Sequence, residues 1–359
     1  MANPRSRTRP ARTGSGVTLQ QVAEHAGVSL ATASRVLHGS GTRTVGEELR
    51  RRVESAAEEL RYISNAPAQA LARSTSAVVG LIVHDVADPY FGAIAAGAMR
   101  AAREHRLMVM IAATFREPGL ELEYLRGLRA QRARAVILAG SGTTDAAATA
   151  RLAEEIAGFE ADGGRVVCIG ERDPELDTVA MANHAGGGLA VRGLWELGHR
   201  RIGVVSGPEE LLTVSQRLDG ARDALRSLGA RLDPADVRTG DFTRAGGRAA
   251  AVRLLTERPD LTGVLVLNDV MAAGALAGLR DDLGLSVPDR VSVVGFDDVP
   301  FAADLRPSLS TVRLPLEAAG EAALRLLLDP APDTPASPRR IPLDADLVLR
   351  GSTAAPPER

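Results

Sequence analysis

The chain has 359 residues, a formal net charge of −2 and 45% apolar residues, enough to build two or three folded units. All 43 basic residues are arginine, and the single cysteine, Cys168, excludes a framework of intrachain disulfides. No apolar run is long enough to span a membrane, and the Pro- and Arg-rich start lacks the apolar segment of a signal peptide. We therefore expect a cytoplasmic protein.

Charge is distributed unevenly along the chain. Residues 1–76 contain 11 Arg against 6 Glu and no Asp, whereas the remainder carries an excess of acidic residues. A basic head on an acidic body favours a head that binds a polyanion such as DNA. Within the head, we expect residues 1–16 to form a disordered basic tail.

Residues 17–63 have the pattern of three helices. In "VTLQQVAEHAGVSLATASRVLHG", Thr18 is placed to cap the first helix, Gly27 to make a tight turn and Ser29 to cap the second helix. Apolar residues of the third helix recur at spacings of four, three and four: Leu49, Val53, Ala56 and Leu60. Short side chains at the start of the second helix are typical of a helix-turn-helix that enters the major groove, although an ordinary helical hairpin is the alternative.

A further short segment with helical character, "NAPAQALAR" at residues 65–73, follows the three predicted helices. Asn65 can cap a helical turn and Pro67 is tolerated in a first turn, but so short a helix is unstable alone in water. Residues 64–76 therefore read as a hinge helix and linker that folds on a partner, or as a passive linker.

From Val78 onward, short aliphatic runs alternate with amphipathic helical stretches. The predicted helices are Phe91–Glu104, Leu120–Ala130, Ala185–Leu197, Leu218–Leu228 and Ala245–Leu255. Strand–helix alternation predicts parallel sheets covered by helices on both faces. Seven or more strands, with a break near Asp173–Ala182, suggest two such sheets in tandem, and Cys168 is expected inside a buried strand.

A family resemblance is carried by "VTLQQVAEHAGVSLATASRVLHG" and "AAEELRYISNAPAQALA" in the head, and by "DVADPYFGAI", "SQRLDG" and "VVGFDD" in the body. Through these motifs, the chain resembles the lactose-repressor/galactose-repressor family of bacterial transcription regulators. The resemblance covers Val17 to about Thr353. It implies an all-α helix-turn-helix head at 17–63, a hinge at 64–76 and an α/β, periplasmic-binding-protein-like core of two parallel-sheet lobes at 77–353. Lobe 1 would comprise about 77–178 and 315–338, and lobe 2 about 179–312 and 340–353.

The resemblance also implies a DNA-binding set that contacts a palindromic operator in double-stranded DNA. Leu30 and Ala31 would read bases through apolar contacts, and Leu71 would wedge between base pairs in the minor groove. The full set is Thr18, Ser29, Leu30, Ala31, Thr32, Ser34, Arg35, His38, Asn65, Ala68 and Leu71. This chain departs from the family at His38, where Asn is usual, and at Gly46, where a Ser usually caps the third helix.

For the body, the resemblance implies a small-molecule effector between the lobes, bound by Asp85, Tyr90, Phe91, Ser141, Arg217, Phe242, Asn268 and Asp297. Asp88 is an alternative to Asp85 as a hydroxyl acceptor. Arg and Asp side chains that engage vicinal hydroxyls, together with an aromatic ring, suit a polyol. Leu314, Asn183 and His184 depart from the family pattern, so a sugar is favoured while a nucleoside or another metabolite stays open.

The apolar helix expected at Pro315–Leu328 exceeds what one lobe needs, and we expect part of it to form the seam of a homodimer. A transport-type solute-binding protein and an α/β enzyme of sugar metabolism are the alternatives. The basic head opposes the first, and the absence of a glycine-rich phosphate loop, a nucleophile elbow or a metal-ligand spacing opposes the second. We expect no cofactor and no metal.

Overall fold

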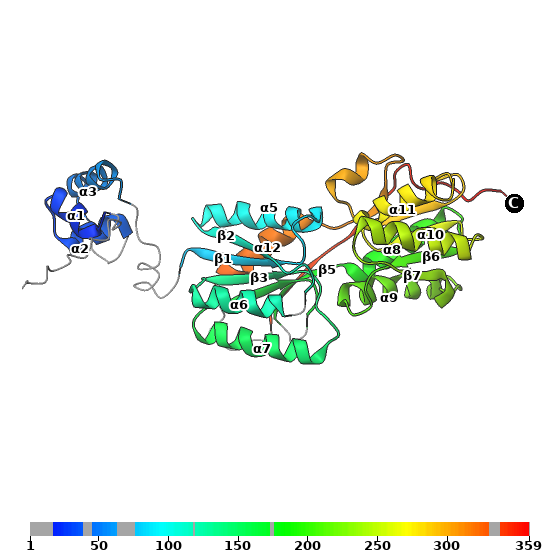
Figure 1. Cartoon of the computed structure of the whole chain (residues 1–359), viewed down its shortest axis with the longest axis horizontal. Coiled ribbons are helices and arrows are strands. Elements are labelled where there is room, and N and C mark those ends of the chain that lie inside the picture. The colour runs from blue at the N-terminus through cyan, green and yellow to red at the C-terminus, as the bar shows by residue number, and fades with distance from the viewer. Residues whose placement is uncertain are drawn as a thin grey trace, which may run out of the picture. The chain divides into compact units, whose positions relative to one another are not determined.

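The computed structural model describes residues 17–38, 45–62, 76–117, 119–172, 176–329 and 338–358. The chain divides into two compact units, residues 1–76 and 77–359, which are described separately below (Figure 1). None of the helices in the described ranges has the length and apolar character needed to cross a membrane. Asn65, Ala68 and Leu71 of the predicted hinge lie outside the described residues.

The described residues of the first unit form three helices, α1 (Leu19–His25), α2 (Leu30–His38) and α3 (Glu47–Glu59). Thr18 caps α1 in a capping box with Gln21, whose side-chain oxygen lies 2.8 Å from the Thr18 nitrogen. Gly27 makes the turn at a φ of +60°, and the Ser29 hydroxyl then accepts a hydrogen bond from the Thr32 N–H at 3.1 Å. The two predicted caps and the glycine turn are confirmed.

Small aliphatic side chains hold this unit together. Val22, Ala33 and Val53, one from each helix, are fully buried at its centre. Arg52 ties α3 to the turn, because its Nη2 donates to the Ala26 carbonyl at 2.6 Å. Leu49 was expected on the buried face but is 37% exposed, since it lies in the first turn of α3 at the edge of this small core.

The described residues of the second unit form two six-stranded sheets, each covered by helices on both faces. In the first sheet all neighbouring strands are parallel, in the order β11 (Arg340–Leu343), β5 (Asp177–Met181), β4 (Val166–Ile169), β3 (Ala135–Ala139), β1 (Val78–Val83) and β2 (Met108–Ala113). Alternate residues of these strands face α5 (Pro89–Glu104) and α12 (Leu316–Leu328) on one side, and α6 (Leu120–Ala130) and α7 (Ala146–Ala161) on the other. Cys168 is fully buried in β4, as predicted.

The second sheet repeats this design. Its order is β12 (Asp346–Val348), β10 (Ser310–Arg313), β9 (Ser292–Asp297), β8 (Gly263–Val266), β6 (Ile202–Ser206) and β7 (Val237–Thr239), with only β12 antiparallel to its neighbour. One face is covered by α8 (Asn183–Glu196) and α9 (Leu212–Ser227), and the other by α10 (Arg244–Glu257) and α11 (Asp269–Asp281). Because both faces of each sheet are buried, the inner strands are continuous apolar runs.

Three connections join the sheets: β5 to α8, β10 to α12, and β11 to β12. The first and third lie a few residues later than the lobe boundaries predicted from sequence. Residues 177–181 fall in the predicted break, and residues 340–343 were assigned to lobe 2, yet the two segments pair as parallel strands of the first sheet. β11 is the edge strand, and its exposed residues Arg340 and Pro342 break the apolar run that marks an inner strand. β5 lies between β11 and β4 and is buried from Thr178 onward, but Asp177 and Thr178 make its sequence polar at the start.

Each face of each sheet is covered by a pair of helices. In three of these four pairs, each helix has a glycine where its backbone touches the backbone of the other helix. A Cβ at Gly97 of α5 would lie 1.9 Å from the Glu317 carbonyl oxygen of α12, and one at Gly320 would lie 2.0 Å from the Ile94 carbonyl oxygen. Equivalent backbone approaches occur between α8 and α9 and between α10 and α11, at Gly187, Gly220, Gly247 and Gly274. Backbones in direct contact leave no room for a side chain at the crossing, so these helix pairs hold fixed positions over their sheets.

Candidate functional site

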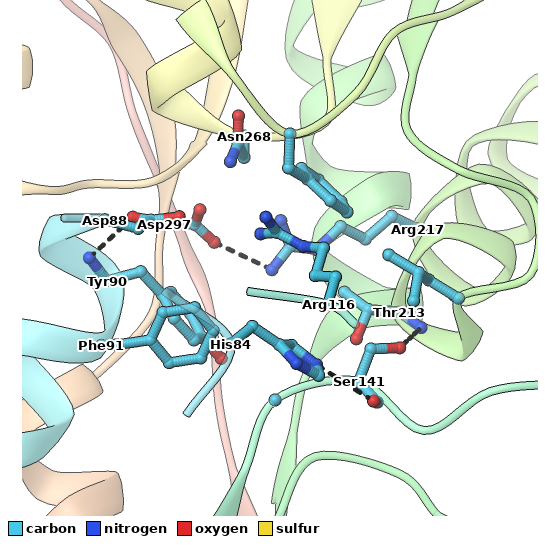
Figure 2. Close-up of a pocket in the computed structure, with 13 residues that line it drawn as sticks. His84, Asp88, Tyr90, Phe91, Arg116, Ser141, Thr213, Arg217, Asn268 and Asp297 are labelled. Carbon is cyan, nitrogen blue, oxygen red and sulfur yellow. Dashed lines mark hydrogen bonds and ion pairs between the residues drawn. The ribbon is translucent and has the colours of Figure 1, made fainter. Parts of the chain in front are cut away.

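A pocket with a cavity volume of about 50 Å³ lies where loops after strands of both sheets meet (Figure 2). Brought together in its lining are seven of the eight residues predicted to bind an effector: Tyr90, Phe91, Ser141, Arg217, Phe242, Asn268 and Asp297. The carboxyl ends of parallel strands are where α/β folds place their ligands. The pocket is therefore the first candidate for a small-molecule site.

Arg217 is the centre of the pocket's polar cluster. Its Nη2 donates to Asp297 Oδ1 at 2.8 Å, its Nε to Asn183 Oδ1 at 2.9 Å and its Nη1 to the Leu267 carbonyl at 2.5 Å. The guanidinium carbon lies 3.7 Å from the centre of the Phe296 ring. Three of its five N–H donors are thus used within the protein, and the side chain is fixed from four directions.

Asp297 has a carboxylate at the end of β9 and a strained backbone. Its φ is +112° and that of Asp298 is +55°, values that non-glycine residues rarely adopt and that are typical of functional turns. Burial, opposed by the charge of Arg217, raises the pKa of Asp297 to about 7. The pair therefore places both a cation and a proton-sensitive acceptor inside the pocket.

Asp88, rather than Asp85, brings a second carboxyl to the pocket. Asp88 caps α5 by accepting from the Tyr90 N–H at 3.0 Å, and burial raises its pKa. Asp85 does not line the pocket, because its Oδ1 accepts from the Ala87 N–H at 2.9 Å in the preceding turn. Of the two alternatives left open by the sequence, the geometry favours Asp88.

His84 and Arg116 line the pocket but were not predicted from the sequence. His84 lies 3.2 Å from the Ser141 carbonyl and 3.3 Å from the Thr114 hydroxyl, so Nε2 donates and Nδ1 accepts. Burial lowers the pKa of His84 to about 4, which keeps the ring neutral at pH 7. Arg116 lies with its guanidinium carbon 5.4 Å from the centre of the Phe242 ring.

A clasp between the two lobes closes one side of the pocket. The Thr144 N–H donates to the Glu210 carbonyl at 2.9 Å, and the Leu212 N–H donates to the Gly142 carbonyl at 3.1 Å. The Thr213 N–H also donates to Ser141 Oγ at 3.0 Å. Main-chain bonds across the cleft make this region sensitive to any change in the angle between the lobes.

Three further residues shape the site indirectly. Asn183, noted in the sequence as a departure from the family pattern, is buried and holds Arg217. Asp269 accepts from the Val299 N–H and from Thr311, at 3.0 and 2.7 Å, and so supports the turn after Asp297. Leu314 is buried in the apolar core and lies outside the pocket lining. No cluster of His, Cys, Asp and Glu suited to a metal ion occurs among the described residues.

The predicted DNA-binding residues of the first unit lie around the start of α2. Leu30 is 47% exposed, Ala31 and Arg35 are exposed, and Thr32 and Ser34 are partly buried. A single exposed apolar side chain is ordinary at a protein surface, so the exposure of Leu30 leaves it accessible to a partner without identifying that partner. Hydroxyls of Thr18 and Ser29 are already engaged in capping. The side chain of His38 lies outside what the structure describes.

Comparison with known proteins gives two family matches. Residues 18–65 match the family described as bacterial regulatory proteins, lacI family, and residues 191–353 match a periplasmic binding protein-like domain. The transcriptional regulator GalS of Salmonella typhimurium is 35% identical over 89% of this chain and 91% of its own length.

Solved structures give the same relationship over the whole fold. The Lac repressor dimer bound to operator and the anti-inducer ONPF has a TM-score of 0.80 and 28% identity, covering 95% of this chain and all of that one. The complex of the transcriptional regulator CelR with cellobiose has a TM-score of 0.69 and 31% identity, covering 94% of this chain and 99% of that one.

Proposed function

This chain belongs to the lacI family of bacterial regulatory proteins and is a DNA-binding transcription regulator, and we propose that a sugar bound between its lobes controls its affinity for operator DNA. Its relatives are transcription regulators, so it is neither an enzyme nor a transport-type binding protein. Because operator DNA lies in the bacterial cytoplasm, we place the protein there.

The buried Arg217–Asp297 pair carries the proposal for a sugar. Removing two charges from water is costly, and a hydrophobic pair of the same size would serve stability at least as well. Both groups retain hydrogen-bonding capacity toward the pocket, since Arg217 uses three of its five donors and Asp297 uses one oxygen. A vicinal diol can donate to the carboxylate and accept from the guanidinium, while the Phe242 ring covers an apolar sugar face. The binding of cellobiose by CelR supports the same class.

For the DNA end, we propose that α2 enters the major groove, with Leu30 and Ala31 in contact with apolar base edges such as thymine methyl groups. The remaining members Thr18, Ser29, Thr32, Ser34, Arg35 and His38 would contact phosphates or base edges. The hinge residues Asn65, Ala68 and Leu71 would fold against the minor groove when two chains bind together. We accordingly propose a DNA-binding head at 17–63, a hinge at 64–76 and an effector-binding core at 77–353.

Two chains would act together on a palindromic operator, and a candidate dimer surface lies in lobe 1. Met108, at 66% exposure, and Met110 and Ile111 lie on the edge strand β2, with Met99 of α5 also exposed. An exposed apolar edge strand is a natural pairing surface. By contrast, the apolar stripe of α12, which the sequence assigned in part to the dimer, is buried against α5 and the first sheet. We therefore propose β2 and α5 for the homodimer.

Control of DNA affinity requires the ligand to prefer one arrangement of the lobes. The pocket is lined from both lobes, and the clasp at Ser141–Thr144 bonds directly to Glu210–Thr213. A ligand that bridges Asp88 and Arg217 would stabilise the closed arrangement. Lobe 1, whose first strand β1 begins at Val78 directly after the hinge segment, would transmit the change to the hinge.

The binding proposal is tested by calorimetric titration of the full chain with a panel of sugars. We expect Arg217→Met to abolish binding of a sugar that the wild type binds, because the guanidinium donors are lost. Arg222→Met is the matched control, since Arg222 lies on the same helix α9 in an exposed ion pair with Asp219. Equal affinities for the wild type and Arg217→Met would contradict the assignment of the site.

A further inference from the structure

A second and larger cavity adjoins the pocket. Its volume is about 290 Å³, against about 50 Å³ for the pocket. It is lined mainly by the loops after β2 and β3 and by α6 and α7, and lobe 2 contributes Pro208, Glu210 and Leu211. The lining of the two spaces is shared at four residues, His84, Arg116, Ser141 and Leu211. We call the larger space the side chamber.

The pocket and the side chamber differ in volume, and so in the size of ligand that each can hold. A cavity of roughly 150 Å³ accommodates one benzene ring. The pocket, at about 50 Å³, is too small for a whole six-membered sugar ring, whereas the side chamber, at about 290 Å³, has room for more than one. In this arrangement of the lobes, a ligand held by the Arg217–Asp297 pair must extend past the shared residues into the side chamber.

The charges around the side chamber nearly cancel. Its carboxylates belong to Glu117, Glu121, Asp145 and Glu210, and its guanidinium groups to Arg116, Arg151 and Arg172. Arg172 is already neutralised, because its Nη1 donates to Glu121 at 2.9 Å, and Asp145 caps α7. Thr114, Thr143 and Thr149 add hydroxyl groups, and Leu122 and Leu152 add apolar surface. A lining with more carboxylates than guanidinium groups suits a neutral ligand with many hydroxyls and disfavours a phosphate.

Arg116 stands at the junction between the two spaces with unused donors. It lines both, and Figure 2 shows its side chain pointing into the pocket. Its Nε is buried without a hydrogen-bond partner. Phe115 and Arg116 have φ values of +50° and +59°, so a strained loop directs this arginine inward. A ligand oxygen at the junction would satisfy the donor.

We propose that the effector is a neutral glycoside of at least two sugar rings. One end contacts the Arg217–Asp297 pair, the linkage passes Arg116, and a further ring occupies the side chamber. This inference rests on the proposed function and narrows its ligand class.

The test fills the side chamber without touching the pocket. Ala148, on α7, lines the side chamber, whereas its neighbour Ala147 is exposed and does not. The full chain and the variants Ala148→Phe and Ala147→Phe are titrated with cellobiose, maltose, lactose, melibiose and trehalose, and with glucose and galactose. Thermal unfolding checks the folding of each variant, and Thr149→Phe, also on the lining, serves if Ala148→Phe unfolds.

We expect at least one disaccharide to bind about tenfold or more tightly than its component monosaccharides. Ala148→Phe should remove that advantage, and Ala147→Phe should retain it. If a monosaccharide binds as tightly as its disaccharide and Ala148→Phe changes neither affinity, the inference is overturned while a sugar effector stands. Tighter binding of glucose 6-phosphate than of any neutral sugar would also overturn it. No binding by any sugar would instead remove the proposed function, and the inference with it.

Discussion

Gly187 of α8 links the packing of lobe 2 directly to the site. A Cβ at this position would lie 2.0 Å from the carbonyl oxygen of Arg217, whereas ordinary contacts begin at 3.4 Å. Gly187→Ala must therefore move α9 away by about 1.4 Å, the difference between these two distances. Overpacking of this kind costs about 1–3 kcal/mol, against which alanine gains at most about 1 kcal/mol in helix propensity.

We expect Gly187→Ala to lower the free energy of unfolding by about 1–2 kcal/mol. A shift of this size would also break hydrogen bonds of Arg217 that are now 2.8–2.9 Å long, and losing one charged hydrogen bond weakens effector binding about tenfold to a hundredfold. Urea unfolding measures the first effect, and calorimetric titration measures the second.

Gly188→Ala is the matched control, because its Cβ would meet its nearest neighbour at 3.4 Å, an ordinary contact. Helix propensity alone then acts, and we expect this variant to be as stable as the wild type or up to about 1 kcal/mol more stable. If Gly187→Ala and Gly188→Ala unfold at the same urea concentration, the reasoning from backbone contact is refuted.

Three other predictions follow from the site and the surfaces. The pKa of Asp297 is about 7, and its ionised carboxylate is the proposed hydrogen-bond acceptor for the effector. Effector affinity should therefore fall about tenfold per pH unit below pH 7 and be constant above it, and Asp297→Asn should lose this pH dependence. Calorimetry from pH 5.5 to 8.5 measures both profiles, and a flat wild-type profile would count against the acceptor role. Leu71→Ala should weaken operator binding strongly in fluorescence anisotropy while effector affinity stays unchanged, and unaltered operator affinity would exclude the wedge. Met108→Glu should convert dimer to monomer in analytical ultracentrifugation, whereas Leu349→Glu should not, because Leu349 is also exposed (51%, against 66% for Met108) but lies on lobe 2. A dimeric Met108→Glu protein would rule out the β2 surface.

The sequence predicted the inner strands and the helix caps well, because each depends on neighbours along the chain. The apolar runs at β1, β3 and β4 correspond to strands buried on both faces, and the predicted helix Leu120–Ala130 matches α6 residue for residue. β5 and β11 were missed because each is short and polar residues interrupt its apolar pattern, Asp177 and Thr178 in β5 and Arg340 in β11. The predicted start of α9 at Leu218 was six residues late, since Thr213, Ser215 and Gln216 give the first turns a polar composition.

The sequence predicted those pocket residues that belong to a recognisable motif. It missed those pocket residues that only the folded chain brings to the site. Arg217, Asn268 and Asp297 came from family motifs, and the structure brings them to one pocket. Arg116 has no motif, and its direction depends on two left-handed residues after β2. The only sequence signal for His84 as a pocket residue was its position directly after a predicted strand. The prediction instead took the next residue, Asp85, as the effector contact. The side chamber depends on how the loops after β2 and β3 pack with α6 and α7, which no local pattern encodes.

The most direct test of the whole account measures operator binding by fluorescence anisotropy, with a duplex that the protein selects from a palindromic library. Titrations are made without sugar and with the disaccharide that binds most tightly, for the wild type and for Arg217→Met. We predict that saturating disaccharide changes the operator affinity of the wild type by about tenfold or more, and leaves Arg217→Met, which still binds the operator, unaffected. Operator affinity that is the same with and without every bound sugar would contradict the claim that the pocket controls the head.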